Sequence, residues 1–171
     1  MNKKQGLEMV VEAIRILDNV PDLVWVLAGE GPSKKDVVEA TAQFTNVRVL
    51  GLQPKSRLND WLNLADIHLL PQKAGAADLV LPSKLLGILA SGRPVVASSP
   101  EESELGQLAE QAGLRVNPED SIGFASAIVR LIEAADLRKQ LGDQARQLAE
   151  QYYRQEAILL RLEDIMVSGE A

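Results

Sequence analysis

The sequence contains no cysteine and only one histidine, His68. Without cysteine the chain can form neither a disulfide nor a thiolate metal site, and a single imidazole excludes a zinc site built from histidines. No run of about 18 or more apolar residues occurs, and residues 1–4 lead directly into amphipathic sequence. We therefore expect neither a membrane span nor a signal peptide, and a cytoplasmic location.

Aromatic residues are also scarce, at 4%, and the net charge is -6. Valine, isoleucine, leucine and alanine must therefore fill the core of this chain of 171 residues, which is most simply one domain. The acidic balance, with a pI near 4.9, argues against an extended nucleic-acid-binding surface. A small anionic ligand stays compatible with it, because a few local donors can hold an anion inside an acidic protein.

Hydrophobic periodicity divides the chain into alternating helices and strands. Helices are expected over residues 5–18, 34–44, 57–64, 83–90, 102–111, 121–134, 135–150 and 153–166. Strands are expected over residues 23–28, 47–50, 66–70, 95–97 and 113–116. The apolar run 23–28 is typical of a strand covered on both faces. The alternation predicts an α/β fold: a doubly wound, Rossmann-like parallel sheet with helices on both faces.

In such a sheet, ligands bind beyond the carboxyl ends of the strands. The breaks at residues 29–33, 51–54, 71–83 and 98–102 all fall at this edge, which locates a site without identifying its ligand. The chain opens with a helix where a doubly wound fold has its central first strand. We therefore expect that this strand is missing and that the sequence is a piece of a longer protein; a natural chain that begins at Met1 is the alternative.

The stretch from Asp78 to Ser99 carries the strongest local signal. Pro82 fixes the entry of the chain, and Ser83 is a good N-cap for the helix that follows. A helix start has unpaired N–H groups and a partial positive charge, which together form an anion site. Lys84 lies in that first turn, where a bound phosphate would favour its charge. The plainer alternative is an ordinary capped helix with a solvated lysine.

Other polar residues each have a functional and a structural interpretation. The segment Gly29-Glu30-Gly31 follows a strand as a phosphate loop does, but the third glycine of a dinucleotide fingerprint is missing, so a tight turn is favoured. His68 lies on a predicted buried strand and is better explained as a core residue than as a catalytic base. Three glutamates could support acid–base chemistry, yet at a helix start they also complement the helix dipole, which is the favoured interpretation. They are Glu101, Glu102 and Glu104.

Several stretches together resemble the C-terminal, nucleotide-sugar-binding half of a two-domain glycosyltransferase of the GT-B type, in the large family of bacterial group 4 transferases. The matching stretches are residues 4–8, 26–32, 46–51 and 64–71, and the strongest is PSKL at 82–85 with LASGRPVVA at 89–97. The resemblance extends to about Met166. It is nearest to extracellular-polysaccharide enzymes similar to the colanic acid transferases.

The resemblance implies that a sugar passes from a nucleoside diphosphate to an acceptor, usually with retained configuration and with neither a bound metal nor another cofactor. It places the diphosphate at Pro82, Ser83, Lys84 and Leu85. It places the base and ribose near Gly29, Glu30, Gly31, Arg48, Gly51, Leu52 and Gly87. The acceptor domain, the usual catalytic groups and any peripheral membrane contact would belong to the missing half. This piece alone should bind the donor without transferring its sugar.

The sequence departs from the family at two glutamates that are commonly eight positions apart. Counting back from Gly92, these positions hold Leu79 and Gly87, so ribose binding must be altered. Asp78 is a candidate replacement for the first glutamate as a sugar contact, and could equally be solvated.

Two alternative functions stay open. The loss of both glutamates slightly favours a non-catalytic, degenerate transferase half that acts as a binding or assembly module. A nucleotide-sugar epimerase half would need His68 or Glu102 in the cleft.

The closing helix, residues 153–166, carries a wide apolar face, which predicts self-association of the isolated piece. Its apolar residues are Ile158, Leu159, Leu162, Ile165 and Met166.

Overall fold

The structure, a computed structural model, describes residues 1, 5–73 and 83–152. Five strands run over Trp25–Ala28 (β1), Val47–Leu50 (β2), His68–Leu70 (β3), Val95–Ser98 (β4) and Gly113–Val116 (β5). The α-helices are Leu7–Ile16 (α1), Lys34–Thr41 (α2), Leu58–Leu64 (α3), Ser83–Ser91 (α4), Glu104–Ala112 (α5), Ser121–Glu133 (α6) and Ala135–Tyr152 (α7). A 3-10 turn at Lys55–Arg57 (η2) leads into α3.

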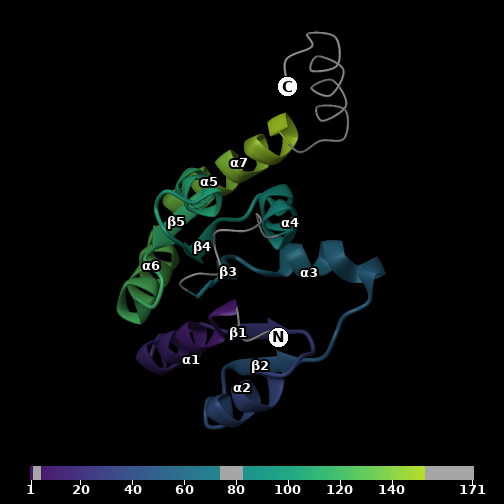
Figure 1. Ribbon diagram of the computed structural model, residues 1–171, viewed down its shortest axis with the longest axis vertical. Coiled ribbons are helices and arrows are strands. Elements are labelled where there is room, and N and C mark those ends of the chain that lie inside the picture. Colours follow the sequence, from purple (N-terminus) through teal and green to yellow (C-terminus); the bar gives the residue numbers. More distant parts are fainter. Residues whose placement is uncertain (2–4, 74–82, 153–171) are drawn as a thin grey trace.

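All five strands are parallel, as the sequence predicts, and they form two sheets with a division between β1 and β3. The strand β1 pairs with β2 from Trp25 beside Val47 to Ala28 beside Leu50. In the other sheet β4 lies between β3 and β5. Figure 1 shows β1 and β2 below, with α1 and α2, and the three-stranded sheet above them.

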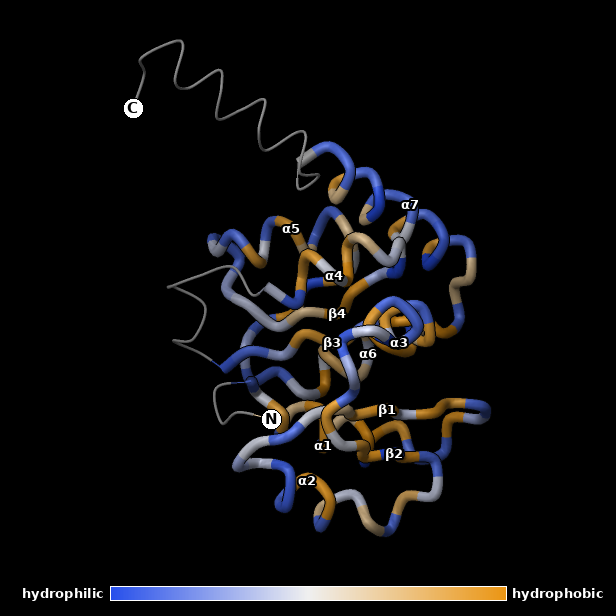
Figure 2. The backbone as a smooth tube through the Cα atoms, turned by 90° about the vertical axis from the view of Figure 1, so that its right-hand side faces the viewer, coloured by the Kyte–Doolittle hydropathy of each residue, from blue (hydrophilic) through white to orange (hydrophobic). Residues whose placement is uncertain are grey.

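Helices cover both sides of the strand layer. On one side, α1 packs on α2 and on α6, and α6 also contacts β4 and β5. On the other side, α7 lies across α4 and α5. The central strand β4 separates two cores, because Val96 joins the cluster with α1 and α6, and Val95 and Ala97 join the one with α4 and α5. The outer face of α7 is hydrophilic, which is consistent with its place on the surface (Figure 2). The doubly wound α/β prediction is confirmed.

One expectation about β1 is wrong. The apolar run 23–28 predicts a strand covered on both faces, yet only Trp25 is buried in it, and Val26 is 43% exposed. Trp25 packs into the core with α1, whereas Val24 and Val26 border an open crevice. A continuous apolar run therefore identifies a strand here, but it does not predict that both faces of the strand are buried.

Element boundaries otherwise lie close to those expected. The strands 47–50 and 113–116 have the predicted ends, and the predicted helix 57–64 starts with the 3-10 turn η2. The predicted helix 153–166, with its apolar face, lies outside the described residues. Within the described part of the chain, no helix combines the length and the apolar character that crossing a membrane requires.

Candidate functional site at the carboxyl edge of the strands

The helix α4 begins at Ser83, on the connection that follows β3, so its first turn lies at the carboxyl edge of the sheet. The side chains of Ser83 and Lys84 are exposed, whereas Leu85 is fully buried among β4 and α5 residues. Of the four residues expected at the diphosphate, two therefore present side chains to solvent. Leu85 can contribute only its backbone, and Pro82 lies outside the described residues.

The electrostatics of this first turn suit an anion. The turn has no acidic side chain, and Lys84 adds a cation to the partial positive charge of the helix start. For the helix alone, a cation at this end is mildly unfavourable. A bound phosphate, however, would interact favourably with both the Lys84 ammonium and the partial positive charge of the helix start. The arrangement can therefore hold a small anion.

Two loops of the smaller sheet meet beside Glu30. Lys34 Nζ donates to Glu30 Oε1 over 2.6 Å, and this bond holds the pKa of Glu30 below its usual value. A Cβ added to Gly51 would lie 3.0 Å from the same oxygen, so the loops after β1 and β2 touch there. The glycines Gly29 and Gly31 have φ values of 138° and 141°, which favour glycine and fit the tight-turn interpretation.

The N-terminal residue also packs on this loop. The Met1 amino group donates to the Glu30 carbonyl, and Met1 backbone atoms crowd the position that a Cβ on Gly31 would occupy. Close backbone approach thus adds a second reason for glycine at position 31.

Arg48 and Leu52 differ in where they point. The Arg48 guanidinium donates to the carbonyls of Thr45 and Val47, so it turns back toward the amino end of β2. This direction leads away from Gly51 and Leu52, which follow the carboxyl end of the strand. Leu52 is 78% exposed and offers an apolar surface beside the Glu30 loop. The structure therefore brings together the glycine loops and Leu52, and leaves Arg48 apart from them.

Gly87 lies on α4 where α3 packs against it. A Cβ at this position would come within 3.3 Å of Leu62 Cδ1, so the Leu62 side chain covers the place that a longer side chain would occupy. The sugar-contact candidate Asp78, with Leu79, lies outside the described residues.

A polar pair that the sequence analysis missed joins the ends of β3 and β4. The Gln72 N–H donates to Ser98 Oγ over 2.8 Å, and Ser98 Oγ donates in turn to the Gln72 carbonyl over 2.9 Å. Beside them, Ser99 Oγ and Gln72 Oε1 are buried without a hydrogen-bond partner. Consecutive serines closing an apolar strand were the available signal for a polar site here.

An ion pair lies next to this polar pair. Lys73 Nζ donates to Glu8 Oε1 over 2.8 Å, and this bond is the main reason why the pKa of Glu8 is lowered. It links the start of α1 to the connection that follows β3.

His68 has the structural role that its sequence context favours. Its Nε2 lies 3.0 Å from the Leu62 carbonyl and 3.4 Å from Ser91 Oγ. Burial is the main cause that lowers the pKa of His68, so the ring is neutral near pH 7 and donates to the carbonyl. The ring thus ties the end of α3 to the end of α4.

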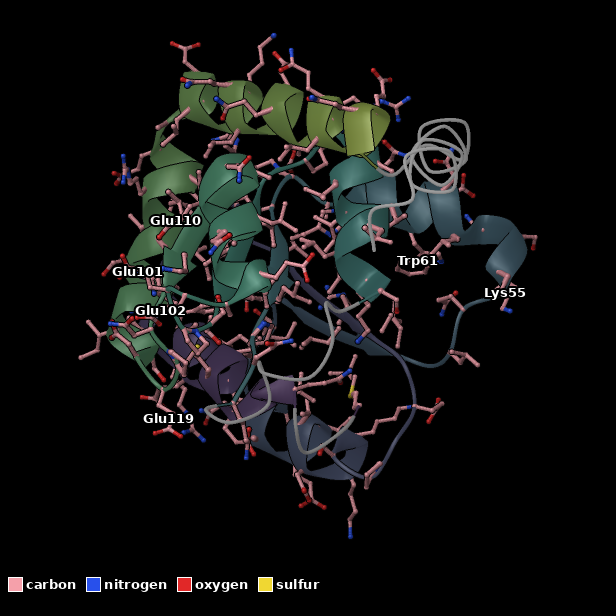
Figure 3. All side chains as sticks on the ribbon, turned by 45° about the horizontal axis from the view of Figure 1, so that its top comes forward. Lys55, Trp61, Glu101, Glu102, Glu110 and Glu119 are labelled. Atoms are coloured by element: carbon pink, nitrogen blue, oxygen red, sulfur yellow. The ribbon has the colours of Figure 1, made fainter. Side chains whose placement is uncertain are left out.

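The candidate glutamates lie at or just before the start of α5. Figure 3 shows Glu101 and Glu102 on the side of the molecule opposite Lys55 and Trp61. Glu101 forms an ion pair with Arg115 at 3.5 Å, and Arg115 also donates to Glu110 over 2.8 Å. The helix α5 begins at Glu104, which complements its dipole.

The Ser103 side chain caps α5 by accepting from the Gly106 N–H over 3.0 Å.

Among the described residues, no group of three or more histidine, cysteine, aspartate or glutamate side chains is placed to hold a metal ion.

The fold is that of a doubly wound α/β domain with a candidate site at the carboxyl edge of its strands, and comparison with known proteins gives the family. A family model described as "Glycosyl transferases group 1" matches residues 1–134, and the chain belongs to this family. The chain is 37% identical over 164 residues to a colanic acid biosynthesis glycosyl transferase, WcaI, of Escherichia coli (strain K12). That match covers 93% of this chain and 39% of WcaI, so the chain spans about two fifths of that relative's length.

Solved structures of glycosyltransferases share the fold. HepE of Anabaena, solved in complex with UDP-glucose, superimposes with a TM-score of 0.79 at 17% identity, over 98% of this chain and 46% of HepE. The C-terminal domain of the group 1 glycosyl transferase LpcC of Francisella tularensis gives a TM-score of 0.74 at 20% identity, over 91% of this chain and 83% of that domain. The resemblance to a GT-B glycosyltransferase of exopolysaccharide synthesis is therefore confirmed.

Proposed function

We propose that this chain is the donor-binding half of a glycosyltransferase, and that it holds a nucleoside diphosphate sugar for bacterial polysaccharide synthesis. The observation that carries the proposal is the exposed start of α4, where Ser83 and Lys84 face solvent at the carboxyl edge of the strands. The diphosphate would accept hydrogen bonds from the first-turn amides and from Lys84 Nζ. HepE, a structural neighbour, binds UDP-glucose, which supports this class of ligand.

The base and ribose would lie over the loops after β1 and β2. Those loops meet at Glu30 and Gly51, and Leu52 adds an apolar surface on which a base could rest. Arg48 would have to leave its two carbonyl acceptors to reach such a ligand. With glycine at position 87, the ribose would be held by backbone groups or by Glu30 rather than by a carboxylate on α4.

The whole protein would transfer the sugar to its acceptor in the cytoplasm, without a resident metal. The acceptor domain, which is not in this sequence, would supply the usual catalytic groups and any contact with the membrane surface. The isolated chain would bind the donor without turning it over, and the apolar residues of 153–166 would drive its self-association.

Titration calorimetry with UDP and GDP tests the proposal on this chain and on Lys84→Ala. A charge-assisted hydrogen bond contributes roughly 1.5–3 kcal/mol, so the variant should bind about ten- to a hundredfold more weakly. Lys139→Ala is a matched control, because Lys139 is exposed on α7 and pairs with Asp143 on the same helix. Equal affinity in the Lys84 variant and the control would remove Lys84 from the site.

The second candidate is a non-catalytic binding module. One contact favours it: Leu62 covers Gly87, where the family commonly has a glutamate for the ribose. Turnover of any nucleotide sugar by the intact parent protein would exclude this candidate, and binding of UDP without turnover would support it.

A further inference from the structure

The loops that follow β1 and β2 are linked by one side chain beyond the end of their strands. The β1–β2 ladder ends with the bond from the Gly29 N–H to the Leu50 carbonyl, at 3.1 Å. After this bond both strands end, and the chain leads from β1 to α2 and from β2 to η2. The contact between the two loops then passes to the carboxylate of Glu30.

The Glu30 carboxylate accepts hydrogen bonds from both loops. Lys34 Nζ, in the first turn of α2, donates to Glu30 Oε1 over 2.6 Å. This bond is the main cause that lowers the pKa of Glu30, and a hydrogen bond from the Leu52 N–H, on the loop after β2, lowers it further. We call the Glu30 carboxylate with its two donors, the Lys34 ammonium and the Leu52 N–H, the Glu30 bridge.

Gly51 leaves the space that this bridge occupies. A Cβ at position 51 would lie 3.0 Å from Glu30 Oε1 and 3.9 Å from Lys34 Nζ. Gly51 is not among the described glycines with a positive φ, so the contact, and not the backbone conformation, favours glycine there. Gln53 Nε2 donates to the Gly51 carbonyl over 3.1 Å, which adds a second restraint on the same loop.

The bridge acts locally and not on the stability of the whole domain. The side chains of Lys34 and Glu30 are 31% and 56% exposed, and exposed ion pairs add little to the free energy of folding. Leu52 is 78% exposed, so its side chain has little packing of its own to hold it. A carboxylate that accepts from the Leu52 N–H restricts the conformations open to this loop.

We propose that Glu30 is a positioning residue for the nucleoside: it orders the loop after β2 so that Leu52 presents its apolar surface to the base. This inference rests on the proposed function, and it assigns Glu30 a role through Leu52 instead of a contact with the ribose. The diphosphate would bind at the start of α4, beside the other sheet, and would not depend on the Glu30 bridge (Figure 1).

The test compares UDP with inorganic pyrophosphate, which lacks the nucleoside, by titration calorimetry on the full chain. Glu30→Ala should weaken UDP binding about three- to tenfold, because binding must then also order the loop. The affinity of this variant for pyrophosphate should equal that of the unsubstituted chain. The amide oxygen of Glu30→Gln can still accept from both donors, so this variant should bind UDP within about twofold of the unsubstituted chain.

Glu39→Ala is the matched control. Glu39 is an exposed glutamate that pairs with Lys35 within α2, at 3.7 Å, as Glu30 pairs with Lys34. Neither alanine variant should shift the urea midpoint of unfolding appreciably. Equal UDP affinity in Glu30→Ala and in the control would overturn the proposal.

Two other results would also overturn it. A parallel loss of UDP and pyrophosphate binding in Glu30→Ala would show that the whole site is disturbed. A Glu30→Gln variant that binds UDP as weakly as Glu30→Ala would show that the charge contacts the ligand directly.

Gly51→Ala tests the same contact from the other loop. Its new Cβ should displace the Glu30 carboxylate and weaken UDP binding, whereas in the Glu30→Ala background it should cause no further loss. Additive losses would contradict the bridge. If the unsubstituted chain fails to bind UDP, the proposed function is refuted and this inference with it. If the unsubstituted chain binds UDP and the Glu30 and Gly51 variants bind it equally well, only this inference is refuted.

Discussion

Two neighbouring residues at the start of α4 should have opposite roles. Lys84 is exposed and would act through the ligand, whereas Leu85 is 0% exposed and packs among residues of β3, β4 and α5. Leu85→Ala should lower the free energy of unfolding by about 2–5 kcal/mol, through lost burial and the cavity left behind. For a domain of this size that corresponds to a fall in Tm of roughly 5–15 °C.

The matched control for this prediction is Leu86→Ala on the same helix. Leu86 is 36% exposed, so its truncation should cost less than about 1 kcal/mol. Urea unfolding gives the stability of each variant, and calorimetry with UDP gives its affinity, measured at a temperature where all are folded. Leu85→Ala should change stability with little effect on affinity, and Lys84→Ala should do the reverse. Equal stabilities of the Leu85 and Leu86 variants, or a large stability loss in Lys84→Ala, would refute this assignment of roles.

Three further predictions concern stability. Because burial lowers the pKa of His68, the unfolded chain binds that proton more readily. Stability should be complete above the ordinary pKa of about 6.5 and should decline as pH falls through the lowered folded value. The urea midpoint of unfolding of His68→Gln, measured from pH 7.5 to 5, should fall less steeply with pH than the midpoint of the unsubstituted chain. Parallel pH profiles of the two proteins would contradict the assignment. Gly142→Ala should destabilise the protein by about 1–3 kcal/mol, because the new Cβ would meet the Gly92 carbonyl oxygen that packs α7 against α4. Helix propensity alone predicts that alanine at position 142 stabilises the protein. A raised Tm would therefore show that the Gly92 carbonyl can move away from the new Cβ at little cost. The Asp120 side chain accepts from the Gly123 N–H over 2.8 Å at the start of α6, so Asp120→Ala should cost about 1 kcal/mol in urea unfolding and Asp120→Asn much less. Equal losses in these two variants would point to charge rather than capping.

The sequence predicted most of the fold because each element carries a local signal. The strands β2 and β5 have their predicted ends, and the apolar run of β4 is buried on both faces. The same kind of run in β1 misled, because burial depends on neighbours that are distant in sequence. Nothing local distinguishes Val26 beside an open crevice from Val96 inside a core.

For the candidate site, the sequence could predict where its residues lie in the fold but not how their side chains are directed. The topology placed it at the carboxyl edge, and the Ser83–Lys84 pair lies there. Side-chain directions could not be predicted, since they depend on tertiary partners. Arg48 turns back to the Thr45 carbonyl, and Leu85 turns into the core. The hydrogen bonds between Gln72 and Ser98 join residues 26 positions apart, and no spacing rule in the sequence reveals such a pair.

The division of the strand layer affects how the two halves of the candidate site are held together. Within the described residues no ladder of backbone hydrogen bonds joins the two sheets. The contact between them therefore depends on the packing of α1 against α6 and on the Glu8–Lys73 ion pair. An exposed pair contributes at most about 1 kcal/mol, and apolar packing weakens on cooling. Backbone ladders do not share that temperature dependence. The distance between the Glu30 loop and the start of α4 therefore depends on packing that weakens on cooling.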